Sequence, residues 1–310
     1  MPDPTQLFTL HRTLRVPDSE GSSYNLPPSL GAFPVVACKD TAAPLAWEKD
    51  YMFPMYRSEA MWVGFRSHHV PTAITMTASG VNVLTGDVVT DIDKMQLIAD
   101  PQNYMVTPPQ PWLDGIKHAD GKVRQFVAVS FDSGKSLGQQ VAGIKDDTIK
   151  MVFYPSKHPD KYERPRSFMR SMTSMTYSSS VMSFESIDNA PVAGASMSMG
   201  IGAGGEIDQK VYPDPHGINE WDLEKPTKIT LRVVNALMWE ALTGKKPPYP
   251  PPTANNYRYH NYPWFDLYEE RMSDIKPSDV LAAIKSVFDG DESKVITRPP
   301  VPIIMKNATE

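Results

Sequence analysis

The chain has 310 residues, of which 41% are hydrophobic and 22% charged, and its formal net charge is −5 at pH 7. This balance excludes global disorder and disfavours nucleic acid as a partner, because there is neither a large net charge nor a basic excess. The single cysteine excludes an internal disulfide and a cysteine zinc cluster. No apolar run approaches the ~18 residues of a membrane span and no signal peptide is visible, so we expect a cytoplasmic protein without a membrane partner.

Proline supplies 30 residues, roughly twice its usual share of about 5%. Because proline breaks helices and removes a donor from β-ladders, the elements between prolines must be short. We therefore predict a mainly β (α+β) protein with long proline-rich loops and a few C-terminal helices. The expected organisation is an N-terminal arm (1–32), a β-rich core (33–166), a Ser/Met/Gly-rich loop (167–205) and a strand-plus-helix portion packed on the core (206–310).

Short apolar, β-favouring runs between turn-forming residues predict the strands of the core. They lie at residues 33–38, 61–66, 72–77, 81–85, 122–131 and 148–154. The third and fourth are joined by a turn at 78–80 and predict a hairpin. No helix-length periodic segment separates these strands, which favours an antiparallel β-sandwich or barrel over a parallel α/β unit.

Residues 167–205 consist almost entirely of Ser, Met, Thr, Gly and Ala and are interpreted as a linker or surface loop. A mobile flap and a membrane-inserting hairpin are the alternatives, although the alternation of a lipid-facing strand is missing. Within this stretch, residues 200–205 match the spelling Gly-x-Gly-x-x-Gly. Because no strand precedes the motif and no helix follows it, we predict a flexible or tightly turning loop, and no nucleotide or other cofactor.

The C-terminal third predicts a strand at 228–234 followed by a helix that Asn235 caps and Gly244 ends. A second helix is predicted over 278–289, where apolar side chains recur at helical spacing. Between them, the proline run at 247–252 indicates a stiff connector or, alternatively, a ligand for an aromatic groove.

Signatures of enzymes are absent from the sequence. There is no His-x-x-x-His pair for a metal and no Gly-x-Ser-x-Gly turn for a nucleophile, and Cys38 reads as a core residue. We therefore predict no metal site. If the protein is a hydrolase or a metal-dependent enzyme, its site must be assembled from distant loops. The best titratable candidates for such a site are Asp114, His118, Arg124, Asp214 and His216.

Aromatic side chains cluster at residues 47–56 and 257–268, where they could form a sugar platform, a protein-binding hot spot or packing against the β core. Loop aromatics and glycines supply the candidate binding residues. These are Trp112, Gly202, Gly205, Trp221, Tyr262, Trp264 and Phe265.

Several segments resemble a family of uncharacterised proteins of similar length. They include residues 51–62, 110–116, 123–128 and 263–266, and the common order runs from about residue 33 to 270. The chain departs from the family at 144–147, where Ile-Lys-Asp-Asp replaces a glycine-bearing turn. The resemblance implies no activity, cofactor or catalytic residue.

These observations favour a non-enzymatic, β-rich binding or self-assembling structural protein. Its partner would be a second copy of the chain, another protein or a glycan, the last making it lectin-like. The alternatives are a hydrolase or metal-dependent enzyme with a loop-assembled site, and a membrane-inserting protein that uses residues 167–205.

Overall fold

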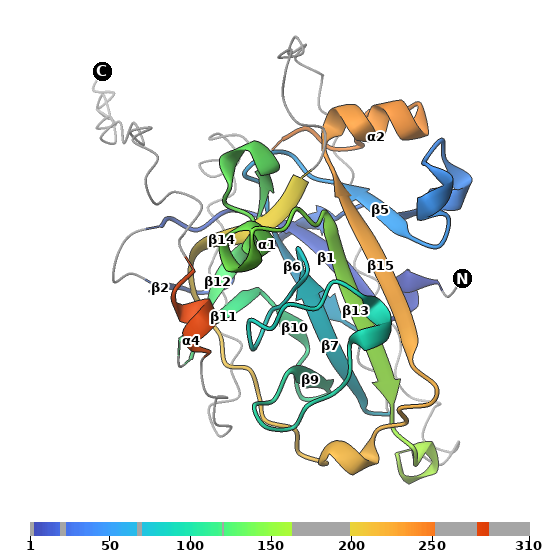
Figure 1. The fold of residues 1–310 in the computed structure, drawn as a ribbon, viewed down its shortest axis with the longest axis vertical. Helices are drawn as coiled ribbons and strands as arrows, with labels where there is room; N and C mark the ends of the chain where they lie inside the picture. Colours follow the sequence, from blue (N-terminus) through green and yellow to red (C-terminus); the bar gives the residue numbers. More distant parts are fainter. Residues whose placement is uncertain are drawn as a thin grey trace, which may run out of the picture.

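A computed structural model of the protein describes residues 3–18, 23–66, 70–119, 121–162, 199–251 and 278–284. In this part of the chain two β-sheets are accompanied by a few short helices (Figure 1). The prediction of a mainly β protein is therefore confirmed. No helix in the described ranges is long and apolar enough to span a membrane.

The first sheet has eight strands, arranged along the path β2-β14-β12-β6-β1-β3 with β10 beside β6 and β11 beside β12. Their bounds are β1 Phe8–Thr13, β2 Ser23–Tyr24, β3 Ser29–Ala32, β6 Ala60–Phe65, β10 Trp112–Leu113, β11 Gly115–Ala119, β12 Lys122–Ser130 and β14 Met199–Asp208. All neighbours are antiparallel except β14 and β2, which makes the sheet mixed.

The second sheet has seven strands along the path β4-β5-β15-β13-β7-β8, with β9 beside β7. Their bounds are β4 Val36–Ala37, β5 Tyr51–Pro54, β7 Thr72–Ala78, β8 Val81–Asn82, β9 Tyr104–Thr107, β13 Thr148–Pro155 and β15 Thr227–Val234. Among the described strands of this second sheet, β15 and β5 form the one parallel pair.

The main hydrophobic core contains residues of both sheets, among them Phe126, Met61 and Met151. Residues of β13 alternate between this core and the opposite face, where a second cluster surrounds Trp221. A third cluster, around Trp239, covers the β5–β15 end of that same face. The second sheet is thus covered on both sides, which explains why β13 is buried from Thr148 to Tyr154.

Most predicted strands are confirmed to within a residue or two at their ends, and so is the hairpin of β7 and β8. Its turn uses Ser79 and Gly80, both with positive φ (50° and 77°). The strand predicted at 33–38 is wrong in part: only Val36–Ala37 is a strand, and Cys38 begins a 3-10 helix. Cys38 is buried, as expected of a core residue.

The prediction of a loop at 200–205 is wrong, because these residues form most of strand β14, which pairs with β12. Their glycines bring other chain segments close. A Cβ atom on Gly205 would lie 2.2 Å from the Pro17 carbonyl oxygen, and one on Gly200 would lie 2.7 Å from Ser136 Cβ. The motif therefore serves close packing within a sheet. Residues 167–198 of the predicted loop lie outside the described residues.

Helix α2 (Ala236–Thr243) agrees with the prediction. The Asn235 side chain accepts a hydrogen bond from the Met238 amide (2.8 Å), and Gly244 ends the helix at φ 70°. Helix α1 (Leu137–Ala142), between Ser136 and Gly143, was not predicted. Helix α4 (Asp279–Ala282) is shorter than the predicted 278–289, and residues from 285 onward are outside the described part.

Short 3-10 helices complete the loops. They are η1 Pro4–Gln6, η2 Cys38–Asp40, η3 Leu45–Trp47, η4 Ile92–Lys94, η5 Phe131–Ser133, η6 Pro159–Lys161 and η8 Ile218–Glu220.

Candidate functional site

In the described part of the chain, no hydrogen bond or ion pair joins the five titratable candidates into one cluster. His118 and Arg124 lie on the neighbouring strands β11 and β12, where His118 Nε2 is 3.2 Å from Glu206 Oε1. Arg124 donates a hydrogen bond of 2.7 Å to the Ile284 carbonyl, just after α4. Burial lowers the pKa of His118, and the positive charge of Arg124 lowers it further. His118 and Arg124 therefore lie close to each other, and both contact the segment of α4.

Asp214 and His216 form a second group, in the loop after β14. Asp214 Oδ2 accepts hydrogen bonds from the Tyr104 hydroxyl (2.7 Å) and from Trp221 Nε1 (2.9 Å), while Oδ1 accepts one from the His216 amide (2.8 Å). Burial and the bond to Asp214 raise the pKa of Tyr104. The carboxylate thus fastens the loop to β9. Trp221, a predicted binding residue, is wholly buried in this contact.

Asp114 lies between β10 and β11. One carboxyl oxygen, Oδ2, accepts a hydrogen bond from Trp112 Nε1 (3.2 Å), and the Asp114 amide donates to Gln209 Oε1 (2.9 Å). The other oxygen, Oδ1, is buried with no hydrogen-bond partner in the described part of the protein. Burial raises the pKa of Asp114 well above its ordinary value.

The predicted binding residues lie on different elements of the fold. Gly202 and Gly205 are buried inside β14, and Trp112 is half-buried on β10. Tyr262, Trp264 and Phe265 lie outside the described residues. Among the residues that the structure does describe, no group of three His, Cys, Asp or Glu side chains could hold a metal ion.

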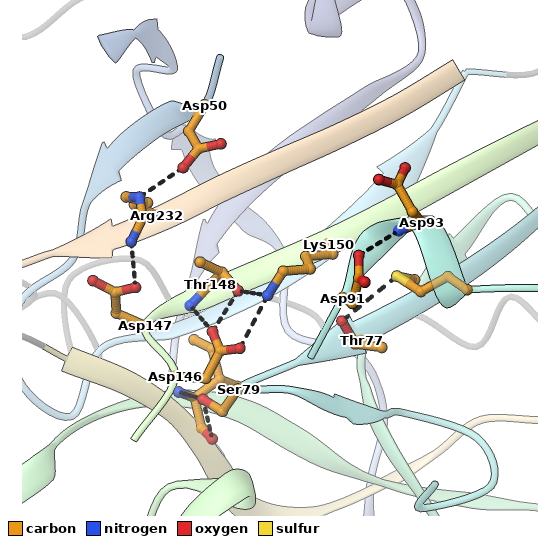
Figure 2. Close-up of polar contacts among 12 residues, drawn as sticks. Asp50, Thr77, Ser79, Asp91, Asp93, Asp146, Asp147, Thr148, Lys150 and Arg232 are labelled. Carbon is orange, nitrogen blue, oxygen red and sulfur yellow. Dashed lines mark hydrogen bonds and ion pairs between the residues drawn. The ribbon is translucent and has the colours of Figure 1, made fainter. Parts of the chain in front are cut away.

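Charged side chains gather on the second sheet in a pattern that the sequence did not suggest (Figure 2). Arg232 on β15 binds Asp50 on one side (Nε–Oδ2, 2.8 Å) and Asp147 on the other (Nη1–Oδ1, 2.8 Å). Its guanidinium lies 4.3 Å from the centre of the Trp47 ring. Burial raises the pKa of both carboxyl groups, and Arg232 opposes that shift.

The same face continues with Lys150 on β13, whose Nζ is 2.9 Å from Asp146 Oδ2 and also bonds to Thr148. Farther along, Lys228 Nζ is 2.7 Å from Asp93 Oδ1. In each contact a carboxylate faces a cation. This arrangement links loops to the sheet and leaves none of these carboxylates as an uncommitted acid or base.

A cavity of about 580 Å³ lies at the β4 end of the second sheet, close to α2. Figure 1 shows α2 near the end of β5. We call this cavity the edge groove. It is lined by Val35, Val36, Ala37, Asp40, Thr41, Trp239, Leu242, Thr243, Lys245, Lys246 and Pro248. Its lining combines apolar and aromatic side chains with two lysines and one aspartate.

One wall of the edge groove is the open edge of a sheet. Strand β4 is the last strand of its sheet and pairs with β5 alone among the described strands. The Cys38 amide donates to the Asp50 carbonyl (2.9 Å), so Cys38 faces β5. Because backbone groups alternate along an antiparallel strand, the N–H and C=O of Ala37 point away from β5 and outward from the sheet edge.

The opposite wall comes from α2. Helical spacing places Trp239 and Leu242 three residues apart on one face, and both belong to the cluster that packs on β5. The Ala42 amide donates to the Leu242 carbonyl (2.9 Å), which joins the end of α2 to the chain after η2. Lys245 and Lys246 follow the helix and are exposed.

A second cavity, of about 340 Å³, lies at the other end of α2 between Tyr56, Ser130 and Asn235. None of the predicted candidate residues lines either cavity. The sequence did indicate a strand near residue 36 and the helix that begins after Asn235. It held no signal that these segments lie side by side.

Comparisons with protein-family models, curated proteins and solved structures found no match. The resemblance noted in the sequence therefore rests on its segments alone. What the protein does must be argued from its geometry.

Proposed function

We propose that the protein is a non-enzymatic binding protein, and that its edge groove takes an extended segment of a partner protein as an added strand beside β4. The observation that carries this proposal is the placement of Ala37, whose outward N–H and C=O are the hydrogen-bonding pair that an added strand requires. An unpaired sheet edge can pair with another chain, and in the two-residue strand β4 it is Ala37 that offers the groups for this.

The rest of the groove suits side chains of such a segment. A strand projects alternate residues to the same side, so one set would reach Trp239 and Leu242 while the other stays in solvent. Lys245 and Lys246 outnumber the single Asp40 at the rim, which favours acidic residues in the partner. A cavity of this volume is in the range of known ligand sites.

The alternative of a loop-assembled hydrolase or metal enzyme has less support. Its candidates Asp114, His118 and Asp214 each contact a different partner, and none of them lines either cavity.

A proline substitution tests the proposal with little disturbance of the fold. Ala37 has φ −73° and ψ 130°, which a proline adopts without strain, and its N–H is not used in pairing with β5. Ala37→Pro should therefore remove the outward donor while leaving β4 in place. Ala37→Ser is the matched control, because it changes the side chain and keeps the donor.

The probe is a displayed library of random twelve-residue peptides selected on the wild-type protein. We expect the selected peptides to be acidic and strand-forming, and to lose roughly tenfold or more in affinity with Ala37→Pro but not with Ala37→Ser. Selection of no peptide, or equal binding by the two variants at unchanged melting temperature, would contradict the proposal.

A further inference from the structure

The proline run does more than connect two elements, because residues 247–251 are held against the first sheet by specific hydrogen bonds. Arg12 Nη2 donates to the Pro250 carbonyl (2.9 Å), and the Tyr56 hydroxyl donates to the Tyr249 carbonyl (2.8 Å). The Tyr249 ring centre lies 5.0 Å from the Arg12 guanidinium. A Tyr-Pro segment is therefore seated in a site of donors and rings.

The residues of that site also contact one another. Arg12 is buried and its Nε donates to Glu59 Oε1 (2.7 Å), while Glu59 Oε2 accepts a hydrogen bond from the Tyr56 amide (2.9 Å). The Phe33 ring centre lies 5.9 Å from the guanidinium. We call these four residues, with Pro34 and Pro54, the arginine groove. Only about 10 Å³ of it is left empty beside the proline run.

The chemistry of the arginine groove matches proline-rich chain in particular. A proline residue has a carbonyl but no N–H, so it can accept hydrogen bonds from the site and has no backbone donor left unsatisfied. Arg12 and Tyr56 supply those donors, and the guanidinium adds a cation–π contact with the tyrosine ring. Aromatic grooves recognise proline-rich segments in the same general way.

The segment itself lies at the surface. Residues 248–251 are exposed, Tyr249 by 38%, so few apolar contacts hold them. The residues before them, Gly244 at φ 70° and the exposed pair Lys245 and Lys246, carry the chain away from α2. Release of the run from the groove would therefore leave the two sheets intact.

We propose that the arginine groove is a receptor for Tyr-Pro segments, and that the proline run of a second copy of this chain can replace the chain's own. Every copy carries both the groove and the segment that fits it. Two copies that exchange their proline runs would therefore fill each other's grooves and form a two-fold symmetric dimer. We identify the occupant as a Tyr-Pro segment because the chain's own Tyr-Pro segment fills the groove. This inference concerns a site other than the edge groove, although Pro248 lines both.

A variant without a functional proline run, which we call the vacated variant, tests whether the arginine groove binds Tyr-Pro segments. Tyr249 is replaced by Gly and the prolines at 247, 248, 250 and 251 by Ser in the full chain, which removes the ring and the stiffness of the run. The probe is the labelled peptide Lys-Lys-Pro-Pro-Tyr-Pro-Pro. We expect the vacated variant to bind it about tenfold or more tightly than the wild type, whose groove is occupied. Adding Tyr56→Phe, which removes one donor, should reverse most of that gain.

A mixing experiment then tests exchange between copies. Vacated chains offer an empty groove, and Tyr56→Phe chains offer an intact run with a weakened groove of their own. The two are mixed, and light scattering after size exclusion measures the mass of the complex. We expect a heterodimer from the mixture and none from either variant alone.

Each outcome decides the inference. Failure of the folded, vacated variant to bind the peptide would overturn the receptor. Peptide binding without a heterodimer would overturn exchange between copies. If Tyr56→Phe does not change the peptide affinity of the folded vacated variant, the peptide binds at a site other than the arginine groove. Circular dichroism and the melting temperature of each variant show that it is folded.

Discussion

The imidazole of His11 lies flat on the indole of Trp62, with ring centroids 3.7 Å apart and planes 11° from parallel. The two residues face each other on the antiparallel strands β1 and β6. Burial lowers the pKa of His11 to about 4, because the charged imidazolium loses hydration in this position.

The stack predicts an acid-sensitive step in stability. A folded-state pKa below the unfolded value of 6.5 means that the contribution is complete above pH 6.5 and is lost as the pH falls through 4. We expect the wild type to lose about 1 to 2 kcal/mol more than His11→Gln between pH 7.5 and 4.5, a value reduced for partial exposure. Urea unfolding at both pH values measures the difference, and equal losses would contradict it.

Asp114 predicts the opposite pH dependence. Its raised pKa means that its contribution is complete below the unfolded value of 3.8 and is lost as the pH rises toward the folded-state pKa. Asp114→Asn removes the buried charge and should raise stability at pH 7 by about 1 to 2 kcal/mol. Thermal unfolding measures this change.

Asp214→Asn is the matched control for that substitution. Asp214 accepts three hydrogen bonds, from Tyr104, Trp221 and His216, and an amide cannot accept all of them. The same chemical change should therefore destabilise the protein by about 1 to 3 kcal/mol. Effects of the same sign at the two positions would contradict the contrast.

Close packing of β14 predicts that Gly205→Ala is strongly destabilising. Its Cβ would lie 2.2 Å from the Pro17 carbonyl oxygen, which is backbone and cannot turn aside. We expect a loss of about 2 kcal/mol or more in denaturant unfolding. Gly64→Ala should cost less, since its Cβ would meet only side chains of His11 and Trp62, at 3.1 Å. An equal or larger loss at Gly64 would refute this packing argument.

Charge at the rim of the edge groove predicts salt-sensitive binding of the selected peptides. Replacing both Lys245 and Lys246 by Ala should weaken binding about three- to tenfold at low ionic strength and much less in 0.5 M salt. Lys225→Ala, at an exposed position outside the groove lining, is the control. Fluorescence anisotropy titrations compare them, and a salt-independent loss would argue for a packing role of the lysine stems.

Local sequence patterns were sufficient to predict the elements whose own residues favour the secondary structure that they adopt. The β-branched run of β15 and the cap and stop residues of α2, Asn235 and Gly244, act within a few residues of themselves, so the sequence predicts them. Strand β14 could not be predicted in this way. Its glycines disfavour a strand locally, and the reason for them is a neighbour, Pro17, that lies far away in the sequence.

The candidate sites failed for the same reason. Tyr104 and Asp214 are 110 residues apart in the chain but 2.7 Å apart in space, and the sequence holds no mark of that contact. Likewise, Ala37 and Trp239 each read as ordinary apolar residues. Their role as two walls of one groove depends on how sheet and helix meet, which only the tertiary structure specifies.

The order of strands in the second sheet has a consequence for its assembly. Strand β15 lies between β5 and β13, although it follows them by more than seventy residues in the chain. During synthesis, the edges of β5 and β13 that face β15 stay unpaired until residues 227–234 have left the ribosome. Such long-range closure slows folding. The edge groove needs both β4 and α2, so it cannot form before residues 236–243 are made.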